Sequence, residues 1–318
     1  MYSYILRRLL YAIPTLLGIT LLIFFVLRIL PGDPLVILYG EGGVGSLSAA
    51  DRMTIQRQLG FDRPLYQQYG SWLIDLLTGN LGYTLARGDS VAEIIRQRGL
   101  ITGEIAVLAV LFSWLVGLPA GILSARWQNS IWDYQVRFLT IIFLGVPSFW
   151  VAMLVAISTF TLFNYRPPLG IIYPWDNLMA NLKIVVGPSV VLGLAISGYI
   201  ARLTRSTFLE VLREDYIRTA RAKGLRESLI VRRHALRNAI LPVLTISGVL
   251  FGLLLSASVA VEQAFAVSGL GSALVQAFQE RDLLVVQTLV FLYGVVFVIL
   301  NLLIDLVYVW VDPRIRYT

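Results

Sequence analysis

The chain has 318 residues, of which 57% are apolar and only 14% are charged, with a formal net charge of +7 and no cysteine. A soluble domain carries about 25% charged residues, so this composition and the mean hydropathy of +0.76 exclude an ordinary soluble protein and indicate several membrane-spanning helices. The absence of cysteine excludes disulfides and thiolate metal sites.

The first predicted element is an apolar helix that follows Arg7 and Arg8. A basic start before an apolar run resembles a secretory signal, but this run is longer than the roughly 7–15 residues of a signal core. No small-residue cleavage site follows, because the chain continues into LPGDP at Leu30–Pro34. We therefore expect residues 1–30 to form a cytoplasmic tip and a retained first span.

Residues 31–99 are predicted to be an external helical insertion. Within it, 47–60 begins with Ser48 as a candidate N-cap and ends at Gly60, which is the pattern of a short helix. Residues 64–77 repeat apolar side chains, among them Tyr69 and Trp72, with a period of 3.6 and predict a second helix.

Six charge-free windows reach about the 20 residues that a helix needs to cross a bilayer. They are Leu9–Leu27, Ile105–Ala125, Phe138–Tyr165, Ile184–Ala201, Asn238–Val261 and Leu283–Ile304. Each is expected to be helical because lipid offers backbone groups no other partners. After the first span, the predicted helices lie at about 101–125, 138–163, 184–203, 239–261 and 285–308. The third window is long enough to include an interfacial turn or a tilt.

Charges in the short loops orient the spans. If six spans alternate, one side receives a basic segment over 202–238 and the arginines of the other short loops: Arg7, Arg8, Arg126, Arg137, Arg314 and Arg316. The positive-inside rule then places both termini, the basic segment and the tail 312–318 in the cytoplasm. Cytoplasmic loops explain the basic balance, so we expect no nucleic-acid partner.

The windows contain no Asp, Glu, Lys, Arg or His, and the chain has no GxxxxGK(S/T) phosphate loop. Intramembrane ionisable groups mark proton and ion paths, so a self-sufficient secondary transporter or channel is disfavoured. Nucleotide hydrolysis by this chain is disfavoured as well. His234 is the only histidine, and no nucleophile motif accompanies it, which argues against a membrane-embedded enzyme. If the chain transports a solute uphill, a partner must supply the energy.

Glycines and prolines occur inside several of the predicted spans. Gly117 with Gly121 and Gly248 with Gly252 have a spacing that allows close helix contact. Four prolines can each bend or break a helix: Pro119, Pro147, Pro188 and Pro242. Broken helices line the path of many transporters, whereas elsewhere they are only bends, and the pattern leaves both interpretations open.

Ten of the chain's 26 Lys and Arg residues lie in the basic segment, where only four acids oppose them. As a helix, Leu209–Gly224 places Leu212, Ile217 and Ala220 on one face and the arginines elsewhere, and Gly224 is a natural C-terminal stop. Such a helix suits insertion into a partner protein's groove. The alternative is a basic loop that rests on anionic lipid head groups.

The wording of this segment closely resembles the cytoplasmic coupling loop of bacterial ABC importer permeases of the oligopeptide/dipeptide permease family, first-subunit type. The pieces that carry the resemblance are EDYIRTARAKGL at Glu214–Leu225 and HALRNAILP at His234–Pro242. Others cover nearly the whole chain: LPGDP at Leu30–Pro34, LGFDRPLYQQY at Leu59–Tyr69, GNLGYT at Gly79–Thr84, VPSFW at Val146–Trp150, ARLTRSTFLEVL at Ala201–Leu212, VEQAFAVSGLG at Val261–Gly271 and DPRIRY at Asp312–Tyr317.

The resemblance implies an all-α integral membrane protein with six transmembrane helices and the type I ABC importer permease fold, its core over 100–311. It implies a bacterial or archaeal cytoplasmic (inner) membrane, a second homologous permease subunit, two ATPase subunits and an external solute-binding protein. The ATPases would bind ATP and Mg²⁺, so this chain is expected to be non-catalytic and to need no cofactor. The implied substrate is a dipeptide, an oligopeptide or a related small solute.

The resemblance also implies which residues contact the ATPase: Asp215, Tyr216, Arg218, Thr219, Ala220, Arg221, Lys223, Gly224 and Leu225. The general permease pattern has Glu-Ala-Ala followed three residues later by Gly. Here Arg218-Thr219-Ala220 stands at those positions and Gly224 is kept, while Arg237 replaces a later proline. A contact made by an acidic residue at the start of the motif is therefore not carried over.

Overall fold

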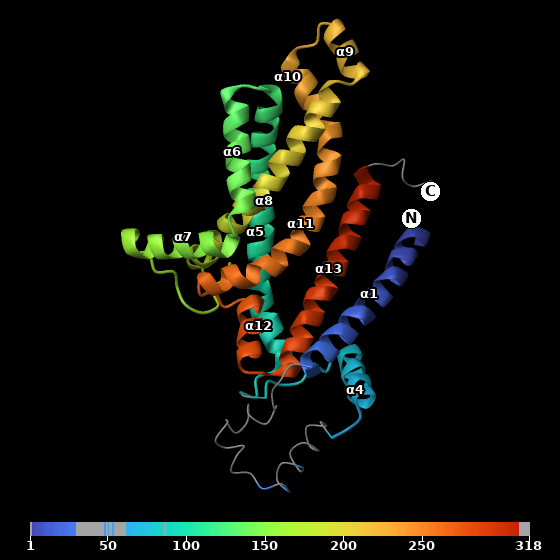
Figure 1. The fold of residues 1–318 in the computed structure, drawn as a ribbon, viewed down its shortest axis with the longest axis vertical. Helices are drawn as coiled ribbons and strands as arrows, with labels where there is room; N and C mark the ends of the chain where they lie inside the picture. Colours follow the sequence, from blue (N-terminus) through green and yellow to red (C-terminus); the bar gives the residue numbers. More distant parts are fainter. Residues whose placement is uncertain are drawn as a thin grey trace. The chain divides into compact units, whose positions relative to one another are not determined.

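The computed structural model describes residues 2–29, 48, 50, 53, 62–85 and 87–311. Apart from an isolated antiparallel bridge between Tyr83 and Ser90, every regular element in these residues is helical (Figure 1). By length and composition, five of the helices in the described ranges can cross a membrane, and a bent pair adds a sixth if it counts as one span. The five are α1 (Tyr2–Ile29), α5 (Val91–Arg126), α8 (Leu178–Leu212), α11 (Leu236–Ala264) with the turns before it, and α13 (Leu283–Val311).

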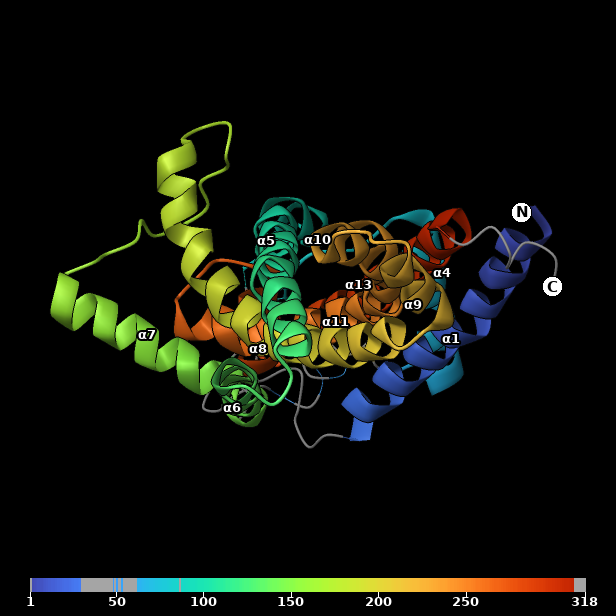
Figure 2. The ribbon, with the colours of Figure 1, turned by 90° about the horizontal axis from the view of Figure 1, so that it is seen from above.

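The bent pair corrects one sequence prediction. The single helix predicted over 138–163 is wrong, because α6 (Ile131–Gly145) and α7 (Ser148–Phe163) meet at 96°. A residue before proline avoids the helical region, and Val146 is extended, with φ −92° and ψ 125°. Figure 2 shows α7 running away from α6. The other three prolines named above lie inside continuous helices.

The chain divides into two compact units, with boundaries inside α5 and α13. The first unit covers residues 1–100 and 269–299 and contains α1, α4 (Leu65–Thr78) and α12 (Leu270–Gln279). Its core joins Phe24 of α1 to Tyr69 and Trp72 of α4. Helix α4 confirms the helix predicted over 64–77, whereas the one predicted over 47–60 lies almost entirely outside the described residues.

The second unit covers residues 101–268 and continues from 300. Its central helix, α8, packs against α6, α7 and α11. Helix α5 approaches α8 closely at Gly121, where a Cβ atom would lie 2.6 Å from the carbonyl oxygen of Ala201. Gly117 lies in the same seam, where a Cβ atom would lie 2.7 Å from Cβ of Ile200. The close contact predicted for this glycine pair is confirmed.

Candidate functional site

The basic segment forms a short helix held between the ends of two long ones. Helix α8 ends at Leu212 and α9 covers Asp215–Ala222. The chain then turns through α10 (Glu227–Leu229) and the π-helical η1 (Ile230–Ala235) into α11. Figure 1 shows α9 at the tip of this unit, where α8 ends and from where the chain returns into α11.

The continuous helix predicted over 209–224 is wrong at its start. The N–H of Arg213 donates to the carbonyl oxygen of Glu210, which closes the last turn of α8, and Glu214 is extended, with φ −64° and ψ 146°. The chain therefore changes direction before Asp215. Asp215 lies in the first turn of α9, where its negative charge interacts favourably with the positive end of the helix dipole.

The C-terminal end of α9 confirms the prediction that Gly224 ends the helix. Gly224 has a left-handed backbone, with φ +75°. The N–H of Leu225 donates to the carbonyl oxygen of Ala220 at 3.3 Å, and that of Gly224 donates to Arg221 at 2.9 Å. These two bonds are the Schellman pattern, which satisfies the last carbonyls of a helix and requires a residue that tolerates positive φ. Gly224 therefore fixes the direction in which the chain leaves α9.

One face of α9 is buried inside the chain. Ile217 is fully buried and Ala220 is 7% exposed, and both pack in a core cluster with Phe208 of α8 and Ala239 of α11. Leu225 packs against the same cluster. The apolar face predicted for this segment is confirmed, and it attaches α9 to both long helices.

The opposite face of α9 is polar and exposed. It presents Arg218, Thr219 and Arg221, and Lys223 follows at the C-cap. Arg221 donates two hydrogen bonds to the carboxylate of Glu227, at 3.2 and 2.7 Å, and these bonds raise the pKa of its guanidinium. Seven of the nine predicted contact residues are thus exposed, whereas Ala220 and Leu225 pack on the inner side of the segment.

A hydrogen bond links the exposed side of α9 to the start of α11. Nδ2 of Asn238 donates to the hydroxyl of Tyr216 at 2.7 Å, and Tyr216 is 41% exposed. Directly before α11, η1 carries Arg232, Arg233 and His234. Single π-helical turns are often found at functional sites. A displacement of α9 would therefore reach α11 through a polar bond as well as through the buried cluster.

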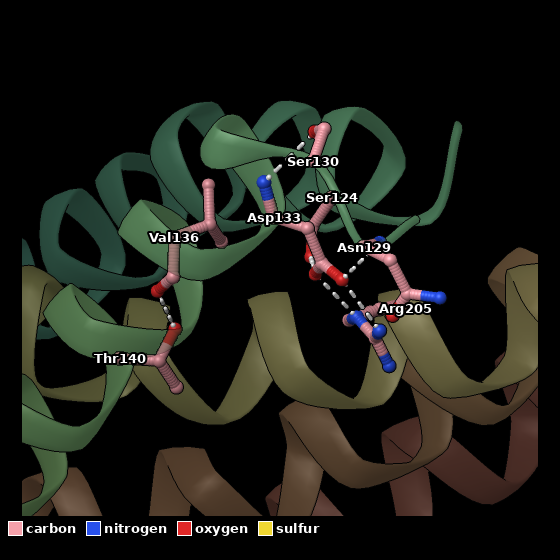
Figure 3. A network of polar contacts seen from close by, with 7 residues as sticks. All are labelled: Ser124, Asn129, Ser130, Asp133, Val136, Thr140 and Arg205. Atoms are coloured by element: carbon pink, nitrogen blue, oxygen red, sulfur yellow. Dashed lines mark hydrogen bonds and ion pairs between the residues drawn. The ribbon is translucent and has the colours of Figure 1, made fainter. Parts of the chain in front are cut away.

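A buried ion pair fixes the same end of α8 to α6 (Figure 3). Arg205 donates to both carboxylate oxygens of Asp133, at 2.8 and 2.9 Å. The hydroxyl of Ser124 and the N–H of Asn129 donate to the same carboxylate. Arg205 is one of the ten cations counted in the basic segment, yet its charge is neutralised inside the protein. Sequence reasoning missed this pair, and its one signal was the N-cap spacing of Ser130 and Asp133.

Within the part of the chain that the structure describes, no group of three or more acidic or histidine side chains could hold a metal ion. The site instead consists of long apolar helices and a short helix, exposed on one face, that is fixed between two of them. That arrangement fits one class of protein, the membrane-embedded subunit of a transporter.

A solved structure has a similar fold. A chain of the MetNI methionine ABC transporter, in an inward-facing conformation, matches with a TM-score of 0.54 and 18% identity over 69% of this chain and 96% of that one. This chain belongs to the family of binding-protein-dependent transport system inner membrane components, whose model matches residues 117–317. A model of the N-terminal part of such membrane components matches residues 1–98.

Two relatives match along their whole length. A protein of Brucella abortus, provisionally named as a peptide transport system permease protein, is 39% identical over 317 residues, covering 100% of both chains. The dipeptide transport system permease protein of Escherichia coli is 37% identical over 340 aligned positions, covering 100% of this chain and 99% of the relative. The chain is thus a multi-pass permease subunit of an ABC importer, a class that works with ATPase and substrate-binding partners.

Proposed function

We propose that the coupling helix Tyr216–Leu225, together with Asp215, docks on an ATPase subunit and that the chain forms half of a translocation path, whose other half is a second homologous permease. The observation that carries this proposal is the division of α9 into a buried apolar face and an exposed polar one. When ATP binding closes the ATPases, the exposed face of α9 moves with them. The contacts of Ile217 and Tyr216 pass that movement to α8 and α11.

The same division argues against insertion of α9 into the hydrocarbon edge of the membrane. A helix that lies in the membrane interface buries an exposed apolar face among the acyl chains. In α9 the apolar residues Ile217 and Ala220 already pack inside the protein. What remains exposed is polar and rich in hydrogen-bond donors, which suits a complementary groove on a protein partner.

The names of the relatives support a substrate class. Because the peptide and dipeptide permeases match this chain from end to end, the proposed substrate is a dipeptide, an oligopeptide or a related small solute. The proposed complex contains two permeases, two ATPases that bind ATP and Mg²⁺, and an external solute-binding protein that docks near residues 31–100. In this scheme the chain is non-catalytic, binds no cofactor, and has both termini in the cytoplasm.

The test is a change of backbone preference at Gly224. In Gly224→Val a β-branched residue must adopt a left-handed conformation, which costs about 1–2 kcal/mol or more for an L-residue. No neighbouring atom lies within 4 Å of a Cβ at this position, so the change acts on the backbone and not through a clash. We expect the purified complex to assemble and to lose the ATPase activity that substrate-loaded binding protein stimulates.

Gly224→Asn is the matched control, because asparagine tolerates the left-handed conformation, and it should keep most of the stimulated activity. Normal coupling in the valine variant would contradict the docking assignment. A self-sufficient transporter, in turn, would carry its solute without any ATPase bound, so transport by the chain alone in vesicles would contradict the whole proposal.

A further inference from the structure

The second unit contains a cavity of about 570 Å³, and no residue of α9 lines it. Its walls come from α7, the segment 165–170, the first turns of α8 and the end of α11. Most of the lining side chains are apolar, among them Val155, Phe160 and Phe265. Two cations, Arg166 and Lys183, also line it.

The two cations have no acidic partner among the residues that the structure describes. The guanidinium of Arg166 lies over the ring of Phe160, 5.3 Å from its centroid. The hydroxyl of Tyr165 donates to the backbone oxygen of Lys183 at 3.0 Å, which holds the two cation-bearing segments together. A cavity lined by apolar side chains and by these two cations fits a ligand with an anionic head and an apolar tail.

The elements around the cavity have the features of a membrane–water boundary. Helix α7 is turned by 96° from α6 (Figure 2), and apolar side chains such as Leu154, Ile157 and Leu162 remain exposed along it. In the segment after α7, the rings of Tyr173 and Trp175 stack with centroids 4.9 Å apart, and Trp175 is exposed. Tyrosine and tryptophan gather where a membrane meets water, so the ligand would reach this cavity from the lipid itself.

We propose that this cavity binds an anionic phospholipid, with its phosphate between Arg166 and Lys183 and an acyl chain along Val155, Phe160 and Phe265. Basic pockets between membrane helices recognise anionic head groups in this way. The rest of the lipid would extend along the exposed apolar side of α7, which gives that side a partner. A free phosphate ion would leave the apolar walls uncovered.

The experiment measures phospholipid binding to the purified complex by native mass spectrometry, with phosphatidylglycerol and phosphatidylcholine as the probes. We expect the complex to bind phosphatidylglycerol more tightly. The double variant Arg166→Gln/Lys183→Gln should bind it about 25-fold more weakly, because each basic side chain near an anionic head group contributes a factor of about five. Arg137→Gln is the matched control, since Arg137 is also exposed and lies over a ring, 5.7 Å from the centroid of Tyr134, but does not line the cavity.

A second variant tests the tail and leaves the charges in place. Ala156 lines the cavity, and Ala156→Phe should fill it and weaken binding of phosphatidylglycerol. Equal binding of the two lipids by the unmodified complex would overturn the proposal, as would equal losses in the double variant and in Arg137→Gln. Displacement of the lipid by inorganic phosphate, with Ala156→Phe unaffected, would show an anion site instead. Displacement by a dipeptide would assign the cavity to the substrate.

Discussion

The carboxylate of Asp133 is a buried charge in the second unit. It is fully buried and takes hydrogen bonds from Arg205, Ser124 and Asn129, while the Arg205 side chain is 23% exposed. An ion pair of this kind stabilises a protein no more than a well-packed apolar pair would. Removing one partner, however, leaves a buried charge without compensation. Asp133 therefore specifies how the end of α8 sits on α6.

Asp133→Asn is expected to destabilise the protein by about 3 kcal/mol, because Arg205 loses its counter-charge in a largely buried position. The melting temperature of the detergent-purified complex measures this effect. Arg96→Gln is the control: it breaks the exposed pair with Glu93 and should cost less than about 1 kcal/mol. Equal shifts of the melting temperature in the two variants would show that the Asp133–Arg205 pair contributes no more to stability than an exposed pair does.

A second buried acid gives the first unit a pH dependence. Asp282 accepts the N–H of Leu85 at 2.6 Å and the N–H of Val285 at 3.3 Å. Burial raises its pKa above the ordinary value, so the folded state holds this proton more tightly than the unfolded state. In such a case stability falls as the pH rises from the unfolded value, about 3.9, through the folded value, and the full cost remains above it.

We therefore expect the first unit to become more stable as the pH is lowered from neutral into that window. Hydrogen exchange of the amides in segment 83–90 measures this stability locally. Asp282→Asn cannot titrate and should abolish the slope while keeping an acceptor for Leu85. If the variant keeps the slope of the unmodified protein, another group is responsible.

At the scale of elements, the seam between α5 and α8 depends on glycine. A Cβ on Gly121 would lie 2.6 Å from the backbone oxygen of Ala201, whereas one on Gly103, in the same helix, would meet nothing within 4 Å. Gly121→Ala should therefore cost about 1–3 kcal/mol through overpacking. Gly103→Ala should be neutral or stabilise by up to about 1 kcal/mol through helix propensity. Thermal unfolding of the two variants checks the contrast, and a stable Gly121→Ala protein would mean that the helices separate at no cost.

Much of this architecture could be predicted from the sequence because its causes are local. Bilayer thickness sets the length of the apolar windows. The sequence predicted that a helix ends at Gly224, and the positive φ of Gly224 is the usual backbone conformation at such an end. The sequence could not show that the chain bends at Pro147 while Pro119 and Pro188 lie inside continuous helices. A proline breaks a helix only where tertiary packing does not satisfy the backbone groups that it frees.

The break between α8 and α9 was missed for a related reason. Residues 209–224 have helical periodicity throughout, so nothing local marks Arg213 and Glu214 as a turn. Packing decides the outcome, because Ile217 reaches the cluster around Phe208 and Ala239 only if the chain turns there. In the same way, the pairing of Arg205 with Asp133 joins residues 72 positions apart, which a charge count cannot show.

At the scale of the whole molecule, the central claim is that α9 is the contact through which an ATPase moves this permease. The chain has no cysteine, so Thr219→Cys introduces its only thiol, on the exposed face of α9. Gln128→Cys places a matched exposed thiol at the turn between α5 and α6. Both would be treated with a short thiol–amine cross-linker in the complete, ATPase-containing complex.

The expected result is a covalent product of permease and ATPase from Thr219→Cys, and none from Gln128→Cys, although a maleimide labels both thiols in the isolated permease. Docking at α9 would be contradicted if Thr219→Cys reacted with the maleimide in the complete complex as readily as Gln128→Cys and formed no product with an ATPase.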